Sequence, residues 1–294
     1  MLDRRVLLGG AAAVGLGSLL GAESGAGRMR FSKSLKIGMI EGARDLTHAF
    51  QIATDAGFDG VELDSPNGYE VAEVVAAKEA TGSKVPGVVL STHWHKPFSA
   101  ADRGVRAEAV EALETAIDDC AAYGGDTVLV VPGVVNAATS YAAAYERSQH
   151  ELAKVLPRCL ERGVKLAFEN VWNGFLLSPL EAARYVDEFE SDAVGWYFDV
   201  GNVVNFGWPH HWIESLGERI LKLDVKEFSR KRRDEEGLWR GFEVEIGDGD
   251  CEWPRVVRAL AAVGYRGWAS AEVAGGDVER LREIAGRMDR VLAL

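Results

Sequence analysis

The feature that most constrains this chain is a regular alternation of short apolar runs with amphipathic stretches. Between the runs lie helical patterns, the clearest covering Arg106 to Tyr123. A strand–helix unit that repeats eight times predicts parallel β/α architecture, and 294 residues suit a closed (β/α)₈ TIM barrel of one domain better than an open sheet. The eight expected strands are residues 35–40, 60–63, 87–91, 127–131, 164–168, 194–198, 220–225 and 267–271.

Glycines mark the ends of several expected helices, because glycine adopts the left-handed backbone conformation at low cost. The helix-ending glycines are Gly57, Gly124, Gly163 and Gly264. No GxGxxG or Walker motif opens a helix, which weakens nucleotide-binding alternatives. The stretch 227–250 is longer than the other connections, and we expect a functional or lid-like loop there, after the seventh strand.

Residues 1–26 have the pattern of an export signal. Arg4 and Arg5 precede a run rich in Gly, Ala and Leu that ends near Leu20. The run is too short and too glycine-rich for a stable membrane span, and the pair resembles a twin-arginine signal. We therefore expect an exported, periplasmic or extracellular protein without a stable membrane anchor, whose barrel occupies residues 27–294. The alternative is a tail with a chance arginine pair.

The charge balance limits the class of partner. Lys and Arg number 33 against 45 Asp and Glu, so the formal net charge is −12. Nucleic acids and anionic membranes attract basic surfaces, so neither is an expected partner. The three cysteines, Cys120, Cys159 and Cys251, lack metal-site spacing, and we expect buried structural thiols.

Four consecutive expected strands end in a carboxylate, namely Glu169, Asp199, Asp224 and Glu272. Active groups of β/α barrels lie at the carboxyl ends of the strands. Acids that meet there repel one another unless a cation or protons intervene. Ligands that are all oxygen favour Mg²⁺ or Mn²⁺ over zinc, so we expect one such ion. The alternative is that these acids are helix N-caps or ion-pair partners in loops.

Other side chains near expected strand ends are candidate substrate contacts. Glu62 lies near the end of the second strand, and His93 and His95 follow the third. Trp172 follows the fifth strand, where a flat aromatic face would suit the apolar face of a sugar ring or simply anchor the loop. The basic run 230–233 either is a solvated charged segment or provides an arginine that binds a substrate oxygen or phosphate.

Six segments, AGFDGVEL, LAFEN, YFDVGN, LKLDVKEF, IGDGD and WASAEV, together resemble the xylose-isomerase-like TIM-barrel superfamily, and within it the sugar phosphate isomerase/epimerase branch. The resemblance covers residues 35–292. It implies a ketose-epimerase-like site in which Glu, Asp, His and Glu hold one divalent metal. On that basis Glu169 and Glu272 are ligands and the acid/base pair, Asp199 is a ligand, and Arg230 contacts substrate.

Two residues depart from that pattern. Asp224 stands where the family has its His ligand. Asp in place of His keeps a ligand, adds negative charge and favours Mg²⁺ or Mn²⁺. Asn202 stands where the family has a His that contacts substrate, and it keeps a hydrogen-bonding group without a titratable one. We expect Asn202 to bind substrate. Because of the two departures, the substrate specificity of the sugar epimerases does not carry over to this chain.

Three functions follow from these residues. The first is a divalent-metal-dependent isomerase or epimerase of a keto-sugar or related polyol, working by proton transfer through an enediolate. The second is a lyase that eliminates a group from a 3-keto-glycoside, a reading that export motivates. The third is a non-catalytic, exported sugar-binding protein whose former active site has lost its activity. In each case the expected partner is a small-molecule sugar or glycoside, and a homo-oligomer is compatible with the sequence.

Overall fold

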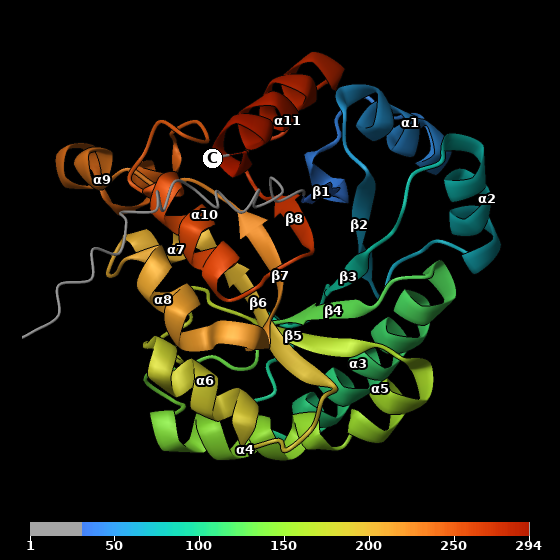
Figure 1. Ribbon diagram of the computed structural model, residues 1–294. Coiled ribbons are helices and arrows are strands. Elements are labelled where there is room, and N and C mark those ends of the chain that lie inside the picture. The colour runs from blue at the N-terminus through green and yellow to red at the C-terminus, as the bar shows by residue number, and fades with distance from the viewer. Residues whose placement is uncertain (1–30, 294) are drawn as a thin grey trace, which may run out of the picture.

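A closed parallel barrel forms the centre of the computed structural model, which describes residues 31–293 (Figure 1). Each strand pairs in parallel with the next, and the eighth pairs with the first, so the predicted (β/α)₈ TIM barrel is confirmed. The export signal predicted for residues 1–26 lies outside the described residues. The strands are β1 (Ser32–Lys36), β2 (Gly60–Ser65), β3 (Gly87–Leu90), β4 (Thr127–Val130), β5 (Lys165–Glu169), β6 (Val194–Asp199), β7 (Ile220–Val225) and β8 (Trp268–Ala271).

Helices surround the barrel and cover the outer face of its strands (Figure 1). Four of the predicted helix-ending glycines have φ between 67° and 96°, as the left-handed stop requires. The α-helices are α1 (Leu46–Ala56), α2 (Val71–Thr81), α3 (Arg103–Tyr123), α4 (Tyr141–Ala153), α5 (Leu156–Arg162), α6 (Pro179–Asp187), α7 (Val200–Val204), α8 (Pro209–Leu216), α9 (Arg230–Glu236), α10 (Trp253–Ala262) and α11 (Val278–Leu292). The 3₁₀ helices are η1 (Ile37–Met39), η2 (Gly217–Arg219) and η3 (Leu238–Phe242).

The first strand begins and ends earlier than predicted. The apolar run 35–40 suggested a strand, but the chain turns into η1 after Lys36. Strand β1 is instead defined by backbone pairing of Ser32–Leu35 with β8, in a segment with few apolar side chains. The other seven strands begin and end within two residues of the prediction.

Side chains alternate between the two faces of each strand, as the pleat requires. Outward-facing residues pack against the helices in the main core, whereas Leu129, Ala167 and Tyr197 form a separate apolar layer inside the barrel. The remaining interior positions hold polar side chains, among them the buried Glu62, Lys222 and Asp224 and the partly buried Lys36. The barrel interior is therefore polar along β1, β2 and β7.

The long connection after β7 is partly helical rather than an open loop. Residues 227–250 contain both α9 and η3, and Ser229 caps α9 by accepting a hydrogen bond from Arg232 N (3.3 Å). Cys120, Cys159 and Cys251 are buried and free, as predicted. Within residues 31–293, no helix has the length and apolarity that crossing a membrane would require.

Candidate metal centre and active site

Carboxylates from four neighbouring strands meet at one end of the barrel. Glu169 ends β5, Asp199 ends β6, Asp224 lies one residue before the end of β7, and Glu272 follows β8. One carboxylate oxygen of each residue lies within 4.8 Å of the corresponding oxygens of the others. The structure thus brings together the four acids that their strand-end positions predicted; we call them the acidic cluster.

Asp199 is held by the amide of Asn170, which is buried behind it. Asp199 N donates to Asn170 Oδ1 (3.0 Å), and Asn170 Nδ2 donates to Asp199 O (2.7 Å). Asp199 Oδ1 accepts from Asn202 N (2.7 Å) and so caps α7. The other oxygen, Oδ2, lies 3.0 Å from Lys226 Nζ. Asp199 is therefore both the helix cap that we weighed as an alternative and a candidate ligand.

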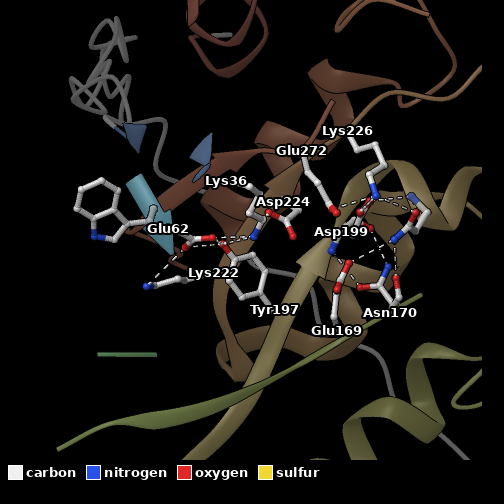
Figure 2. A network of polar contacts seen from close by, with 12 residues as sticks. Lys36, Glu62, Glu169, Asn170, Tyr197, Asp199, Lys222, Asp224, Lys226 and Glu272 are labelled. Atoms are coloured by element: carbon white, nitrogen blue, oxygen red, sulfur yellow. Dashed lines mark hydrogen bonds and ion pairs between the residues drawn. The ribbon is translucent and has the colours of Figure 1, made fainter. Parts of the chain in front are cut away.

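Two partly buried lysines contact the acidic cluster, and the sequence analysis missed both (Figure 2). Lys226 Nζ lies 3.0 Å from Asp199 Oδ2 and 3.0 Å from Glu272 Oε2. Lys36 Nζ lies 2.9 Å from Asp224 Oδ1. Strand periodicity would have placed Lys226 on the face of Asp224, because the two are two residues apart.

The acidic cluster keeps excess negative charge beside these lysines. Four carboxylates and two ammonium groups give −4 + 2 = −2 when all are ionised. Asp199 Oδ2, Asp224 Oδ1 and Glu272 Oε2 are paired with these ammonium groups, and Asp224 Oδ2 has no hydrogen-bond partner among residues 31–293. Hard divalent cations prefer oxygen ligands, so the donor atoms and the charge both fit such an ion.

Without a cation, burial and mutual repulsion shift the pKa values of these acids. Burial, followed by the nearby Glu272 and Asp224, raises the pKa of Glu169 well above its usual value. Burial likewise raises the pKa of Asp199 to about 6, against the opposing effect of Lys226. For Glu272, burial is outweighed by Lys226 and Lys36, and the pKa falls below its usual value. In the metal-free cluster, protonation is therefore favoured at Glu169 and Asp199 and disfavoured at Glu272.

Glu62, predicted as a substrate contact, is enclosed by protein side chains inside the barrel. It is 1% exposed. Its carboxylate accepts from Lys36 Nζ (2.7 Å) and from Tyr197 Oη (2.8 and 2.9 Å), and Lys222 Nζ lies 4.0 Å away (Figure 2). Strand periodicity placed it correctly inside the barrel, but its protein partners satisfy it there.

A cavity of about 880 Å³ opens beside the acidic cluster. Glu169 and Glu272 line it together with Asn202, which donates to Asn170 O (3.0 Å). Trp172 forms part of the wall and donates through Nε1 to Asn202 O (2.9 Å). The predicted substrate contacts Asn202 and Trp172 therefore both lie at the cavity.

The two histidines after β3 lie in different surroundings. His93 is buried and lines the cavity, and its Nδ1 accepts from Val131 N (3.4 Å). Burial lowers the pKa of His93 to about 4, so it is neutral near pH 7. His95 is exposed and lies outside the lining of the cavity. Only Trp94 separates the two histidines, and an irregular turn does not keep both on one face.

Arg230 also lies away from the cavity, contrary to the resemblance-based prediction. Its Nε donates to Val204 O (3.0 Å) and its Nη2 to Gly207 O (2.8 Å). The guanidinium also lies 5.5 Å from the centre of the Trp208 ring. Arg230 therefore ties the start of α9 to the segment between α7 and α8.

A family model described as "Xylose isomerase-like TIM barrel" matches residues 50–291. Among curated proteins, the chain is 25% identical over 282 residues to the L-ribulose-5-phosphate 3-epimerase UlaE of Escherichia coli O1:K1 / APEC, covering 86% of this chain and 94% of that one.

Solved structures share the fold at lower identity. An L-ribulose 3-epimerase superposes with a TM-score of 0.74 at 19% identity, covering 90% of this chain and 95% of that one. The 3-keto-D-glucoside 4-epimerase YcjR from E. coli, in its apo form, superposes with a TM-score of 0.73 at 14% identity, covering 89% and 99%. At these identities the likeness shows the fold alone.

Proposed function

The chain belongs to the xylose isomerase-like TIM barrel family, and on that premise we propose that it is a divalent-metal-dependent epimerase or isomerase of a keto-sugar or related polyol. The observation that carries the proposal is the position of Glu169 and Glu272, two carboxylates of one cluster that both line the cavity. Relatives named as sugar epimerases support it.

The ligands proposed for the ion, Mg²⁺ or Mn²⁺, are the four members of the acidic cluster, Glu169, Asp199, Asp224 and Glu272. A bound divalent ion supplies Lewis-acid polarisation of a substrate carbonyl and offsets developing negative charge. The all-carboxylate donor set favours these hard ions over zinc or cobalt.

The chain's own groups supply the proton transfer and the orientation of the substrate. One of Glu169 and Glu272 removes the proton from the carbon next to the carbonyl, and the other returns a proton to the opposite face or to the adjacent carbon. Asn202 offers its amide to a substrate oxygen, and Trp172 offers an apolar wall to the sugar ring. The intermediate between the two transfers is an enediolate of the sugar.

Solvent-hydrogen exchange tests this proposal most directly. The Mn²⁺-loaded protein is incubated in D₂O with a series of ketoses, and deuterium at the carbon next to the carbonyl is followed by NMR. We expect exchange by the native protein and a loss of about 10²-fold or more in Glu169→Gln and in Glu272→Gln, because each removes one proton carrier and one proposed ligand of the ion.

Glu161→Gln is the charge-matched control, since Glu161 is exposed on α5 and lies outside the lining of the cavity. It should exchange at the native rate. Full exchange by a variant that lacks both Glu169 and Glu272 carboxylates would exclude this mechanism.

A lyase remains a second candidate, because its first step uses the same two glutamates. Proton removal next to the ketone of a 3-keto-glycoside would be followed by elimination of the substituent from the neighbouring carbon. The size of the cavity, about 880 Å³, leaves room for such a substituent. Release of the free aglycone instead of an isomeric sugar would identify the lyase, and binding of sugar without exchange or release would leave a sugar-binding protein.

A further inference from the structure

We propose that the cavity takes an unphosphorylated sugar carrying a flat apolar group and discriminates against sugar phosphates. This inference rests on the proposed function and specifies its substrate class. It differs from the substrate in the name of the curated relative, which is a 5-phosphate.

The cations that line the cavity are already paired with carboxylates. Lys226 lies 3.0 Å from Asp199 and from Glu272, and Lys36 lies 2.7 Å from Glu62 and 2.9 Å from Asp224. No arginine of residues 31–293 lines the cavity. A phosphate dianion would therefore have to displace a carboxylate to gain a cation.

Carboxylates also outnumber cations on the cavity wall. Asp64, Glu169, Glu243 and Glu272 line it together with only Lys36 and Lys226, a formal balance of −4 + 2 = −2. Like charges placed together in a partly desolvated site repel, so this wall opposes a second dianion. One divalent cation in the acidic cluster would bring this formal balance to zero, so the wall would still carry no net positive charge for a phosphate.

The helix that follows β8 begins with a carboxylate. The N-terminus of α11 is capped by Asp277, whose Oδ1 accepts from Arg280 N (3.0 Å). A negative charge at this helix N-terminus makes it less favourable for a second anion.

The basic run after β7 does not reach the cavity either. Arg232 Nη2 pairs with Glu236 Oε2 (2.9 Å), and Arg233 Nη1 donates to Asn205 O (2.9 Å). Arg230 is held by two backbone carbonyls, as described above, and Lys231 is exposed outside the lining. The phosphate-gripping role that the sequence left open is therefore not supported by these contacts.

Aromatic side chains instead form one wall of the cavity. Trp172 lies 4.9 Å from Trp239 and 4.9 Å from Phe242 between ring centres, and all three line the cavity. Trp239 is 67% exposed and Trp94, also in the lining, is 50% exposed. Exposed indole faces beside a sugar site suit a flat apolar substituent. A volume of about 880 Å³ is at the upper end for small-ligand pockets, so a sugar and such a substituent fit together.

Calorimetric titration of the Mn²⁺-loaded protein tests both parts. The first pair of probes is L-ribulose and L-ribulose 5-phosphate, with inorganic phosphate as competitor. The second pair is phenyl and methyl 3-keto-β-D-glucoside. We expect the unphosphorylated ketose and the phenyl glycoside each to bind about tenfold or more tightly than its counterpart, and phosphate not to compete.

Trp239→Ala should weaken binding of the phenyl glycoside by about tenfold and so remove the preference, with a much smaller effect on the methyl glycoside. Trp208→Ala is the matched control, because Trp208 is 48% exposed and outside the lining. Tighter binding of the 5-phosphate, competition by phosphate, or equal affinity for the two glycosides would overturn the inference.

The test of this inference and the test of the proposed function can fail independently of each other. Solvent exchange with a preference for the 5-phosphate would overturn this inference and leave an epimerase. The expected binding preferences without exchange or elimination would support this inference and overturn the enzyme.

Discussion

At the level of single residues, Lys36 and Lys226 set the charge of the candidate metal centre. Lys226 bridges Asp199 and Glu272, and Lys36 bridges Glu62 and Asp224. Lys226 and a divalent cation would draw on the same carboxylates, so the ammonium both stabilises the metal-free state and opposes metal binding. The lysine and the ion should therefore be thermodynamically coupled.

Replacing Lys226 makes this coupling measurable. In the presence of EDTA, Lys226→Met should lower the free energy of unfolding by about 3 kcal/mol, because it leaves buried carboxylates without their cation. Mn²⁺ should restore most of this loss, so the rise in Tm on adding Mn²⁺ should be larger in the variant than in the native protein. Thermal unfolding with EDTA and with Mn²⁺ gives both values.

Lys96→Met is the control for loss of a lysine. Its ion pair with Glu108 is half-exposed, and its removal should cost less than about 1 kcal/mol with either additive. An equal Mn²⁺-induced rise in Tm for native protein and Lys226→Met would show that the lysine and the ion do not share carboxylates.

At the level of elements, the connection between β7 and α10 is organised by one buried carboxylate. Glu227 is 1% exposed, and both of its oxygens accept hydrogen bonds. Its donors are Phe228 N (3.2 Å), Gly247 N (2.8 Å), Cys251 N (3.1 Å) and Trp253 Nε1 (2.8 Å). The same connection carries η3, which provides Trp239 and Phe242 to the cavity wall.

Removing this carboxylate should loosen the cavity wall. Glu227→Ala leaves buried N–H donors without an acceptor, and we expect a loss of about 3 kcal/mol in the free energy of unfolding. Ligand affinity should fall with it, since the connection that carries η3 is loosened. Chemical denaturation and sugar titration measure the two effects. The exposed α9 residue Glu235, changed to Ala, should alter neither, and native stability in Glu227→Ala would show that the hydrogen bonds are not needed.

Another acid, Glu151 of α4, pairs with Arg106 of α3, and this contact makes part of the free energy of unfolding depend on pH. Arg106 Nε lies 2.9 Å from Glu151 Oε1, and Lys154 pairs with the other oxygen. Burial opposes ionisation, but these ion pairs lower the pKa of Glu151 below its usual value of 4.5. A depressed folded-state pKa contributes stability above the unfolded-state pKa, and the contribution disappears as pH falls through the folded-state value.

Glu151→Gln should therefore be less stable than native protein by about 2 kcal/mol near neutral pH, because it leaves Arg106 without its buried partner. The difference should shrink as pH falls below about 4.5. Urea denaturation at several pH values measures it, with the half-exposed Glu108→Gln as a control that should show little difference. A constant difference at all pH values would assign the cost to packing rather than to ionisation.

At the level of the whole molecule, backbone periodicity explains what could be predicted from sequence. Eight alternations give the barrel, and strand-end positions in a parallel barrel bring Glu169, Asp199, Asp224 and Glu272 together. Side-chain reach and pairing are not encoded in that pattern. Arg230 donates to backbone carbonyls. Lys36 and Lys226 pair with the acidic cluster, although most lysines in proteins face solvent.

Export is a property of the full chain that we also propose, from the arginine pair alone. In a bacterium with a twin-arginine translocase, the full-length protein should reach the periplasm and lose its N-terminal segment. Replacing both Arg4 and Arg5 by Lys keeps the charge and should retain the protein in the cytoplasm. Fractionation and mass spectrometry check both, and periplasmic delivery of the lysine variant would contradict a twin-arginine route.

Metal content tests the central claim most directly. Inductively coupled plasma mass spectrometry on native protein, Glu169→Gln and Asp224→Ala, each dialysed against Mn²⁺ and then against buffer, gives the ion bound per chain. Four converging carboxylates predict about one divalent ion per native chain and a large loss in both variants. A native protein that retains no ion after this treatment would contradict the account, because the two lysines would then be the only cations that the acidic cluster needs.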